Sequence, residues 1–431
     1  KTKEAESPKF YDAIVIGTGI SGGWAAKELC EKGLKTLVLE RGRMVKHIEN
    51  YPTAHLDPWD FDLKGDISVK DKNKQLKQSR TGYTTKAASK HWFVNDLKHP
   101  YNETNWNDQV LKESPVERAI RGTVHAKNTL MAGITTVRDL GAEGAGYTDV
   151  YLKKTIEDGI IPGPRMLVAG PAIVATGAYG PKGFHDGVTV PLGAEPASGV
   201  PEVIKTVRRQ MGNGADFIKI YADYRWTPGA TSQPTFLQEE IDAMVATAIS
   251  AGKYVVAHAS TPEGIRRAIN GGVETIEHGA GATLELFKLM KEKGIGFCPT
   301  LAAGDAITQY RGWNKGKDPE PERITKKKVS FKLALESGVD IVFGGDVGVF
   351  THGENYREME LMVAYGMKPL DVLISATSLN ARIFHLDELG KLEKGFLADI
   401  IAVEGDPSKD ISNMKKVVFV MKNGVVYKGG N

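Results

Sequence analysis

Four side chains that can bind a metal or move a proton occur in the second half of the sequence, each near the C-terminal end of a segment that is predicted as a strand. They are Lys219 in FIKIYAD, His258 in VVAHAS, His278 in TIEHG and Asp346 in FGGD. Singly, a strand-end histidine commonly hydrogen-bonds within the core, and a buried lysine can pair with a carboxylate. Together the four residues fit a divalent-metal site, because imidazole and carboxylate are good ligands and a buried lysine is costly unless its charge is removed or paired.

The elements that must position these residues form a repeated strand and helix pattern after residue 110. Seven apolar runs, with amphipathic helices between them, are predicted as strands over 133–141, 164–170, 216–223, 254–260, 275–279, 296–301 and 340–346. This alternation is typical of a parallel α/β fold, in which the carboxyl ends of barrel strands converge on one mouth. Thr261 with Pro262 predicts a helix start, and Thr235 with Gln238 predicts a capping box.

The same segments resemble strands four, five, six and eight of the amidohydrolase superfamily, especially its imidazolonepropionase-like and prolidase-like members. The resemblance runs from about His99 to the C-terminus and includes GITTVRDLG, THGENYREMELM and SATSLNARIFHL. It implies an α/β fold with a (β/α)8-type, TIM-like barrel over residues 99–390 and a β-sandwich remnant over residues 391–431. It also implies a metal-dependent hydrolase of an amide, a peptide or a cyclic amide.

The resemblance further implies a role for each of the four residues. Lys219 corresponds to a lysine that CO2 converts to a carbamate bridging two zinc ions. His258 and His278 correspond to ligands of one metal, and Asp346 to a ligand of the other that also shuttles protons. Water held by such a metal has its pKa lowered to about 7 and can attack a carbonyl as hydroxide. Asp346 would then act as general base and afterwards as general acid.

Two further residues are candidate substrate contacts. Tyr221 has the same strand parity as Lys219 and so faces the same side of the sheet, although a tyrosine there can also be a packing residue. His352 lies in the THGEN loop after the last predicted strand, where an exposed loop histidine is the alternative interpretation.

The HxH pair that the superfamily places at the end of its first barrel strand is absent. No two of the ten histidines are separated by one residue, and KHWFVNDLK offers Phe93 and Asn95 at that place. A carbamate on Lys219 with His258 and His278 still provides three ligands and an open position, as in mononuclear catalytic zinc sites. We therefore expect one zinc ion and a barrel that lacks its usual first strand. We also expect weak or lost hydrolysis, because changing even a residue that only contacts a metal ligand lowers metal affinity or activity about 10- to 100-fold.

The first hundred residues follow a different pattern. An apolar run, a glycine turn, a helical stretch and a second apolar run predict a βαβ unit, with Gly17, Gly19 and Gly22 at the turn and Glu40 closing the second strand. Such glycines let a pyrophosphate approach the helix N-terminus, and the acid can bind a ribose hydroxyl. The segment resembles the opening of a glucose-methanol-choline oxidoreductase, which implies an incomplete FAD-binding or dinucleotide-binding fragment over residues 1–98. We do not expect it to hold FAD stably, because the rest of that domain is missing.

Both resemblances meet near His99, which predicts a chimera of two unrelated genes. Three functions remain open: a metal-dependent amidohydrolase, a flavin-dependent alcohol oxidoreductase, and a catalytically silent barrel that binds a metal or a small ligand. After residue 390, two apolar runs predict antiparallel strands that turn at Asn423 and Gly424 as a type I′ hairpin. The run Lys326, Lys327 and Lys328 is interpreted as a solvated helix face.

Composition limits the partners and the compartment. The 431 residues carry a net charge of +3 and 41% hydrophobic residues, which gives no reason to expect nucleic acid or a membrane as a partner. A small amide or peptide is the expected partner, and a homo-oligomer is left open. Cys30 and Cys298 belong to no CxxC motif, which favours a reducing compartment. We expect a cytoplasmic location, with a removed leader as the alternative because residue 1 is not Met.

Overall fold

The computed structural model describes residues 11–16, 20–39 and 106–429. The chain divides into two units, Lys1–Glu103 and Thr104–Asn431. None of the helices in the described ranges is long and apolar enough to cross a membrane.

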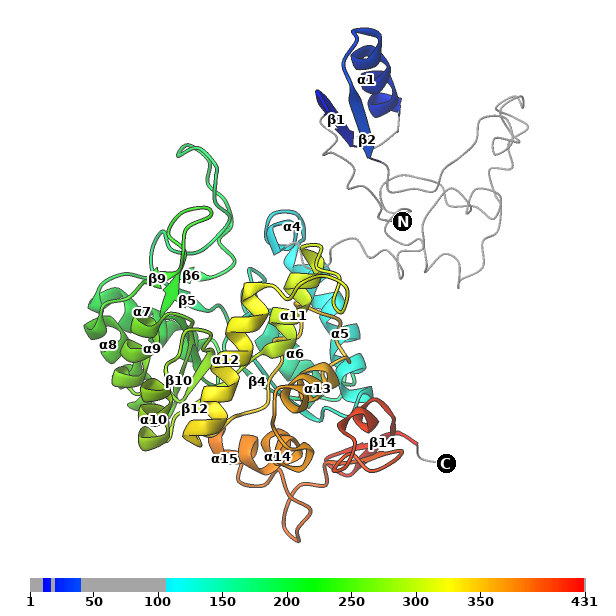
Figure 1. Cartoon of the computed structure of the whole chain (residues 1–431). Helices are drawn as coiled ribbons and strands as arrows, with labels where there is room; N and C mark the ends of the chain where they lie inside the picture. Colours follow the sequence, from blue (N-terminus) through cyan, green and yellow to red (C-terminus); the bar gives the residue numbers. More distant parts are fainter. Residues whose placement is uncertain (1–10, 17–19, 40–105, 430–431) are drawn as a thin grey trace. The chain divides into compact units, whose positions relative to one another are not determined.

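The described part of the first unit is one βαβ unit. Strand β1 (Ala13–Ile16) pairs in parallel with β2 (Thr36–Leu39), and helix α1 (Ile20–Glu31) connects them (Figure 1). The predicted βαβ unit is confirmed, with Gly22 inside α1. The other proposed cofactor contacts, Gly17, Gly19 and Glu40, lie outside the described residues, as do Phe93 and Asn95.

The second unit is built on parallel strands. A six-stranded sheet has the order β12-β11-β10-β7-β5-β6, and β3 pairs in parallel with β4. The strand bounds are β3 Thr136–Asp139, β4 Arg165–Val168, β5 Ile173–Val174, β6 Glu195–Pro196, β7 Ile218–Tyr221, β10 Val255–Ala259, β11 Thr275–His278 and β12 Gly296–Cys298. The backbone N–H of Asp216 donates to the carbonyl of Val168 at 2.8 Å, which places β4 beside the start of β7. Six of the seven predicted strands are therefore present, each shorter than predicted.

The seventh predicted strand is reduced to one parallel bridge between Phe297 and Ile341. Beyond it, the side chain of Asn380 bonds both backbone groups of Phe343, each at 2.9 Å, so a side chain takes the place of a neighbouring strand. Gly344 follows, where an added Cβ would lie 2.7 Å from Sγ of Cys298. Within residues 106–429, β3 pairs with β4 alone and Ile341 pairs with Phe297 alone, so no strand pairing joins β3 to Ile341.

Helices cover the outer face of this sheet, where α8 and α9 contact β10 and α10 contacts β12 (Figure 1). Ile218 and Ile220 of β7 are fully buried against this helical layer, whereas Lys219 between them faces the opposite, inner side. The helix bounds are α4 Trp106–Lys112, α5 Pro115–Met131, α6 Thr148–Glu157, α7 Val200–Gly212, α8 Gln238–Ile249, α9 Pro262–Gly271, α10 Leu284–Lys293, α11 Leu301–Tyr310, α12 Glu322–Ser337, α13 Tyr356–Ala364, α14 Pro369–Ile374 and α15 Asn380–Ile383.

One of the two predicted helix starts is confirmed and the other is wrong. The hydroxyl of Thr261 accepts from the backbone N–H of Gly264 at 3.1 Å, and Pro262 opens α9. Thr235 does not cap α8, because its hydroxyl donates to the carbonyl of Tyr221 at 2.6 Å. The helix instead begins after Leu237, whose backbone N–H donates to the side chain of Glu240 at 2.7 Å.

The C-terminal segment forms a small antiparallel sheet of β13 (Ile400–Val403), β14 (Val417–Lys422) and β15 (Val425–Lys428). Asn423 and Gly424, which join β14 to β15, both have positive φ, at 50° and 77°. Positive φ at both central residues is the requirement of a type I′ turn, so the predicted hairpin is confirmed.

Candidate functional site

Strand register brings four of the candidate residues together. Tyr221 of β7 is the register partner of His258 on β10, and Lys219 lies two residues earlier on the same face. His278 ends β11, the next strand, and its ring lies 4.6 Å from that of His258, edge to face. The ring of Tyr221 stacks on His258 at 4.6 Å, and Nζ of Lys219 lies 5.7 Å from the centre of the Tyr221 ring.

Asp346, in the loop after Ile341, interacts electrostatically with Lys219 of this group. Burial lowers the pKa of the Lys219 amine, and the nearby carboxylates of Glu277 and Asp346 oppose this shift. Desolvation by the surrounding side chains raises the pKa of the Asp346 carboxyl, and the cations of Lys219 and Lys327 oppose that shift. The charges of Lys219 and Asp346 therefore influence each other within one site, in which Lys219 is buried and Asp346 is open to solvent.

The backbone at the site is held in an unusual conformation. His278, Thr300 and Asp346 have positive φ, at 77°, 47° and 59°. Side-chain-bearing residues rarely adopt this left-handed region, and each instance costs on the order of 1–3 kcal/mol. At His278 the consequence is directional, because its place in the strand alternation would otherwise point the ring away from His258.

Each imidazole has one ring nitrogen facing a polar partner. Nδ1 of His278 lies 2.7 Å from Oγ1 of Thr300. Nε2 of His258 lies 3.6 Å from Oδ1 of Asp223, a buried oxygen that has no hydrogen-bond partner. The other oxygen of Asp223 accepts from the backbone N–H groups of Ser260 and Thr261, which fixes the carboxylate. Metal-ligating histidines typically donate their second N–H to such a group, so the arrangement fits histidines that bind a cation through the remaining nitrogen.

The protonation state of His258 and His278 also suits metal binding. Burial lowers the pKa of both His258 and His278 well below its usual value, helped by the cations of Lys219 and Lys327. The neutral imidazole is the form that binds a metal. In the part of the chain that the structure describes, no three His, Cys, Asp or Glu side chains are placed to hold a metal ion. The residues therefore fit a metal on the condition that Lys219 supplies a ligand, and its lowered pKa favours the neutral amine that reacts with CO2.

The other predicted contact, His352, has a partner on a different element. Its ring stacks on His125 of α5, with ring centres 4.1 Å apart and planes 14° apart. Burial and the neighbouring His125 lower the pKa of His352 to about 3. The contact joins the loop that follows Asp346 to α5.

Several residues of the site were not predicted. The hydroxyl of Tyr221 donates to Glu143 at 3.2 Å, and the hydroxyl of Tyr179 donates to the same carboxylate at 2.8 Å. Asp223 could have been found, because it shares the strand parity of Lys219 and Tyr221. Glu143 lies in the glycine-rich segment GAEGAG, where no periodicity indicates the direction of a side chain.

The interpretation of the lysine run is wrong at its central residue. Lys326 is exposed, whereas Lys327 is buried and its Nζ donates to the carbonyl of His278 at 2.9 Å. No sequence signal indicates this contact, because Lys327 and His278 are 49 residues apart.

Comparisons with known proteins identify the family of this chain. The model of the amidohydrolase family matches residues 90–427. Ochratoxinase of Aspergillus niger is 32% identical over 360 residues, which cover 76% of this chain and 72% of the relative. A Xaa-Pro dipeptidase structure with bound methionine in its active site is 37% identical, with a TM-score of 0.64 over 72% of this chain and 79% of that chain. A prolidase complexed with N-methylphosphonate-L-proline is 30% identical, with a TM-score of 0.64 over 75% of this chain and 83% of that chain. The expected superfamily and its prolidase-like branch are thus supported, and this chain belongs to the amidohydrolase family.

Proposed function

We propose that this chain hydrolyses a C–N bond in a small peptide or amide, with one zinc ion and a carbamate on Lys219. The observation that carries the proposal is the pair His258 and His278, whose rings lie 4.6 Å apart and each present one ring nitrogen to a polar partner. The similarity to an ochratoxinase, a Xaa-Pro dipeptidase and a prolidase supports a substrate with an amide or peptide bond.

The site residues have separate roles in this proposal. A bound divalent cation polarises the scissile carbonyl and lowers the pKa of water. Asp346 accepts the proton of the attacking water and returns it to the leaving nitrogen. Desolvation by the surrounding side chains raises the pKa of Asp346, which makes its carboxylate a stronger base than an aspartate at its usual pKa. Tyr221, stacked on His258, is the proposed substrate contact, and His352 supports the loop that carries Asp346 through its stack on His125.

We further propose that turnover is low. A second metal would have the Lys219 carbamate and Asp346 but no imidazole pair, since the sequence contains no HxH. Changing a residue that only contacts a metal ligand lowers metal affinity or activity about 10- to 100-fold, and the loss of two direct ligands should lower them at least as much. The N-terminal βαβ unit, proposed to come from a second gene, is not expected to hold FAD, and the absence of yellow flavin absorbance in the purified protein would agree with this.

The test uses the full chain with added zinc and bicarbonate. It is assayed on Xaa-Pro dipeptides, ochratoxin and cyclic amides, beside Lys219→Met and Asp346→Asn. Wild type should bind zinc and cleave at least one class of substrate slowly. Lys219→Met should lose zinc binding, and Asp346→Asn should bind zinc but not turn over. Zinc binding without cleavage of any substrate would favour the catalytically silent barrel, and no zinc binding would refute both interpretations.

A further inference from the structure

Lys327 is a buried cation on a helix, and it contacts His278 of the candidate metal site. It lies on α12 and is 6% exposed. Its Nζ donates to the carbonyls of His278, at 2.9 Å, and Pro299, and to Oγ1 of Thr300 at 3.3 Å. The same hydroxyl oxygen lies 2.7 Å from Nδ1 of His278. Lys327 therefore contacts the backbone of His278 directly and its ring through Thr300.

A buried carboxylate binds the backbone that follows Thr300. Glu358 of α13 is 0% exposed and accepts from the backbone N–H groups of Leu301, at 2.9 Å, and Ala302, at 2.6 Å. These residues begin α11 directly after Thr300. Burying a cation and a carboxylate is costly unless both are partnered. Here Lys327 bonds the backbone of Pro299 before Thr300 and that of His278, and Glu358 bonds the backbone after Thr300. His278 and Thr300 both have positive φ, which persists only where the surroundings impose it.

Hydrogen-bond chemistry relates these contacts to the ring of His278. An ammonium has donors and no acceptor, so Lys327 occupies one lone pair of the Thr300 hydroxyl oxygen. The second lone pair can accept a hydrogen bond from an N–H group at Nδ1 of His278. A ring with its proton on Nδ1 has its free lone pair on Nε2, which is the form required of a metal ligand at that atom.

We propose that Lys327 is a positioning residue for the metal site, which acts through Thr300 to hold the His278 ring with Nε2 directed at the cation. This inference rests on the proposed function. A purely structural role for Lys327, as an anchor of α12, would leave the metal affinity of the folded protein unchanged.

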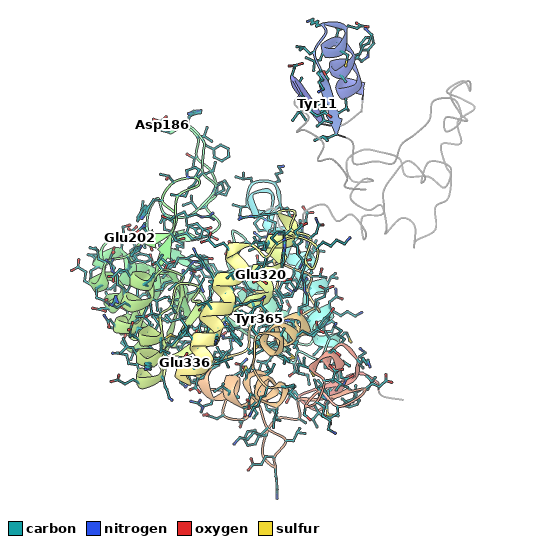
Figure 2. All side chains as sticks on the ribbon, in the orientation of Figure 1. Tyr11, Asp186, Glu202, Glu320, Glu336 and Tyr365 are labelled. Carbon is teal, nitrogen blue, oxygen red and sulfur yellow. The ribbon has the colours of Figure 1, made fainter. Side chains whose placement is uncertain are left out.

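The first test compares Lys327→Met with Lys326→Met on the same helix. Lys326 is 64% exposed and pairs with Glu322 at 2.8 Å, so it is a matched control outside the site. Lys328 is less suitable, because it pairs with Glu320 and lies over the ring of Tyr365, both labelled in Figure 2. Zinc affinity is measured on folded full-length protein by competition with a chromophoric chelator. Lys327→Met should bind zinc about 10- to 100-fold more weakly, and Lys326→Met should stay within about twofold of wild type.

The second test keeps Lys327 in place and changes the hydroxyl through which it acts. Thr300→Ser retains the hydroxyl and should bind zinc like wild type, whereas Thr300→Val removes it and should bind about 10-fold more weakly. The ¹⁵N shifts of the His278 ring in the metal-free protein should change in Thr300→Val and Lys327→Met but not in Thr300→Ser. If Lys327→Met does not fold, the comparison of Thr300→Ser with Thr300→Val still tests whether the Thr300 hydroxyl positions the His278 ring.

The outcomes separate the inference from the function on which it rests. If wild type binds zinc and both Lys327→Met and Thr300→Val bind it equally well, the positioning role is refuted and the hydrolase proposal stands. If wild type binds no zinc, the proposed function fails. The ring shifts then decide alone, because an unchanged His278 signal in Thr300→Val and Lys327→Met would overturn the positioning role.

Discussion

The guanidinium of Arg138 on β3 donates to the carboxylate of Glu277 on β11 at 3.2 Å, which joins two strands that are not hydrogen-bonded neighbours. The side chains are 7% and 3% exposed. Arg138 also donates to the hydroxyl of Thr275 at 3.3 Å and lies 3.7 Å from the centre of the Phe384 ring. Arg138 and Lys219 lower the pKa of Glu277 against the effect of burial. The pair therefore ties β3 to the strand that ends in His278.

Breaking this pair should destabilise the fold strongly. Arg138→Met leaves the Glu277 carboxylate buried without its main partner, and we expect a loss of about 3–5 kcal/mol in the free energy of unfolding. The double variant Arg138→Met with Glu277→Leu should recover most of that loss, because an apolar pair leaves no uncompensated charge. Urea unfolding measures both variants. Equal stability of the single and double variants would show that charge compensation is not the reason for the loss.

Asp223 should affect the metal more than the fold. Asp223→Asn keeps an oxygen for the N–H groups of Ser260 and Thr261 but can turn an N–H group toward Nε2 of His258. Because that nitrogen would no longer face an acceptor, zinc affinity should fall about 10- to 100-fold. Chelator competition measures the affinity, and a thermal melt measures the fold. Asp186→Asn, in an exposed loop (Figure 2), is the control, and an equal affinity in both variants would contradict a role for Asp223.

The stack of His352 on His125 should make stability depend on pH. Burial and His125 lower the pKa of His352 to about 3, whereas an unfolded histidine titrates near about 6.5. Between these values the unfolded chain holds the extra proton, so stability falls as the pH falls, by at most about 1.4 kcal/mol per pH unit. His352→Asn should lose less stability than wild type between about pH 7 and about pH 5 in urea unfolding.

The control for this pH dependence is His185→Asn, which changes an exposed histidine and should follow wild type. If His352→Asn and wild type lose the same stability over that range, the stacked ring is not the acid-sensitive group.

The hairpin after β14 should tolerate glycine but not a β-branched residue. Asn423 has a φ of 50° and is exposed, so the turn conformation and not packing decides its type. Asn423→Val should cost about 1–2 kcal/mol, the usual penalty for a left-handed residue with a bulky Cβ. Asn423→Gly should be close to neutral, and a thermal melt compares the two. A valine variant as stable as the glycine variant would argue against a type I′ turn.

Local sequence determined the elements and the main ligand candidates of this protein. Strand parity alone places Lys219, Tyr221 and Asp223 on one face, and the carboxyl ends of parallel strands bring His258 and His278 to the same edge. The hairpin at Asn423 and Gly424 was predictable for the same reason, because its backbone requirement involves adjacent residues. Such rules act over two to four residues, which a sequence displays directly.

The tertiary structure decided which distant groups meet. Arg138 and Glu277 are 139 residues apart, and Lys327 and His278 are 49 residues apart. Glu240, and not Thr235, binds a backbone N–H group at the start of α8, because the hydroxyl of Thr235 donates to the carbonyl of Tyr221. Buried charges are stable only beside specific partners, and which partners a lysine or an arginine reaches depends on how strands and helices pack. That packing, not the spacing of residues along the chain, determines the environment of the two histidines.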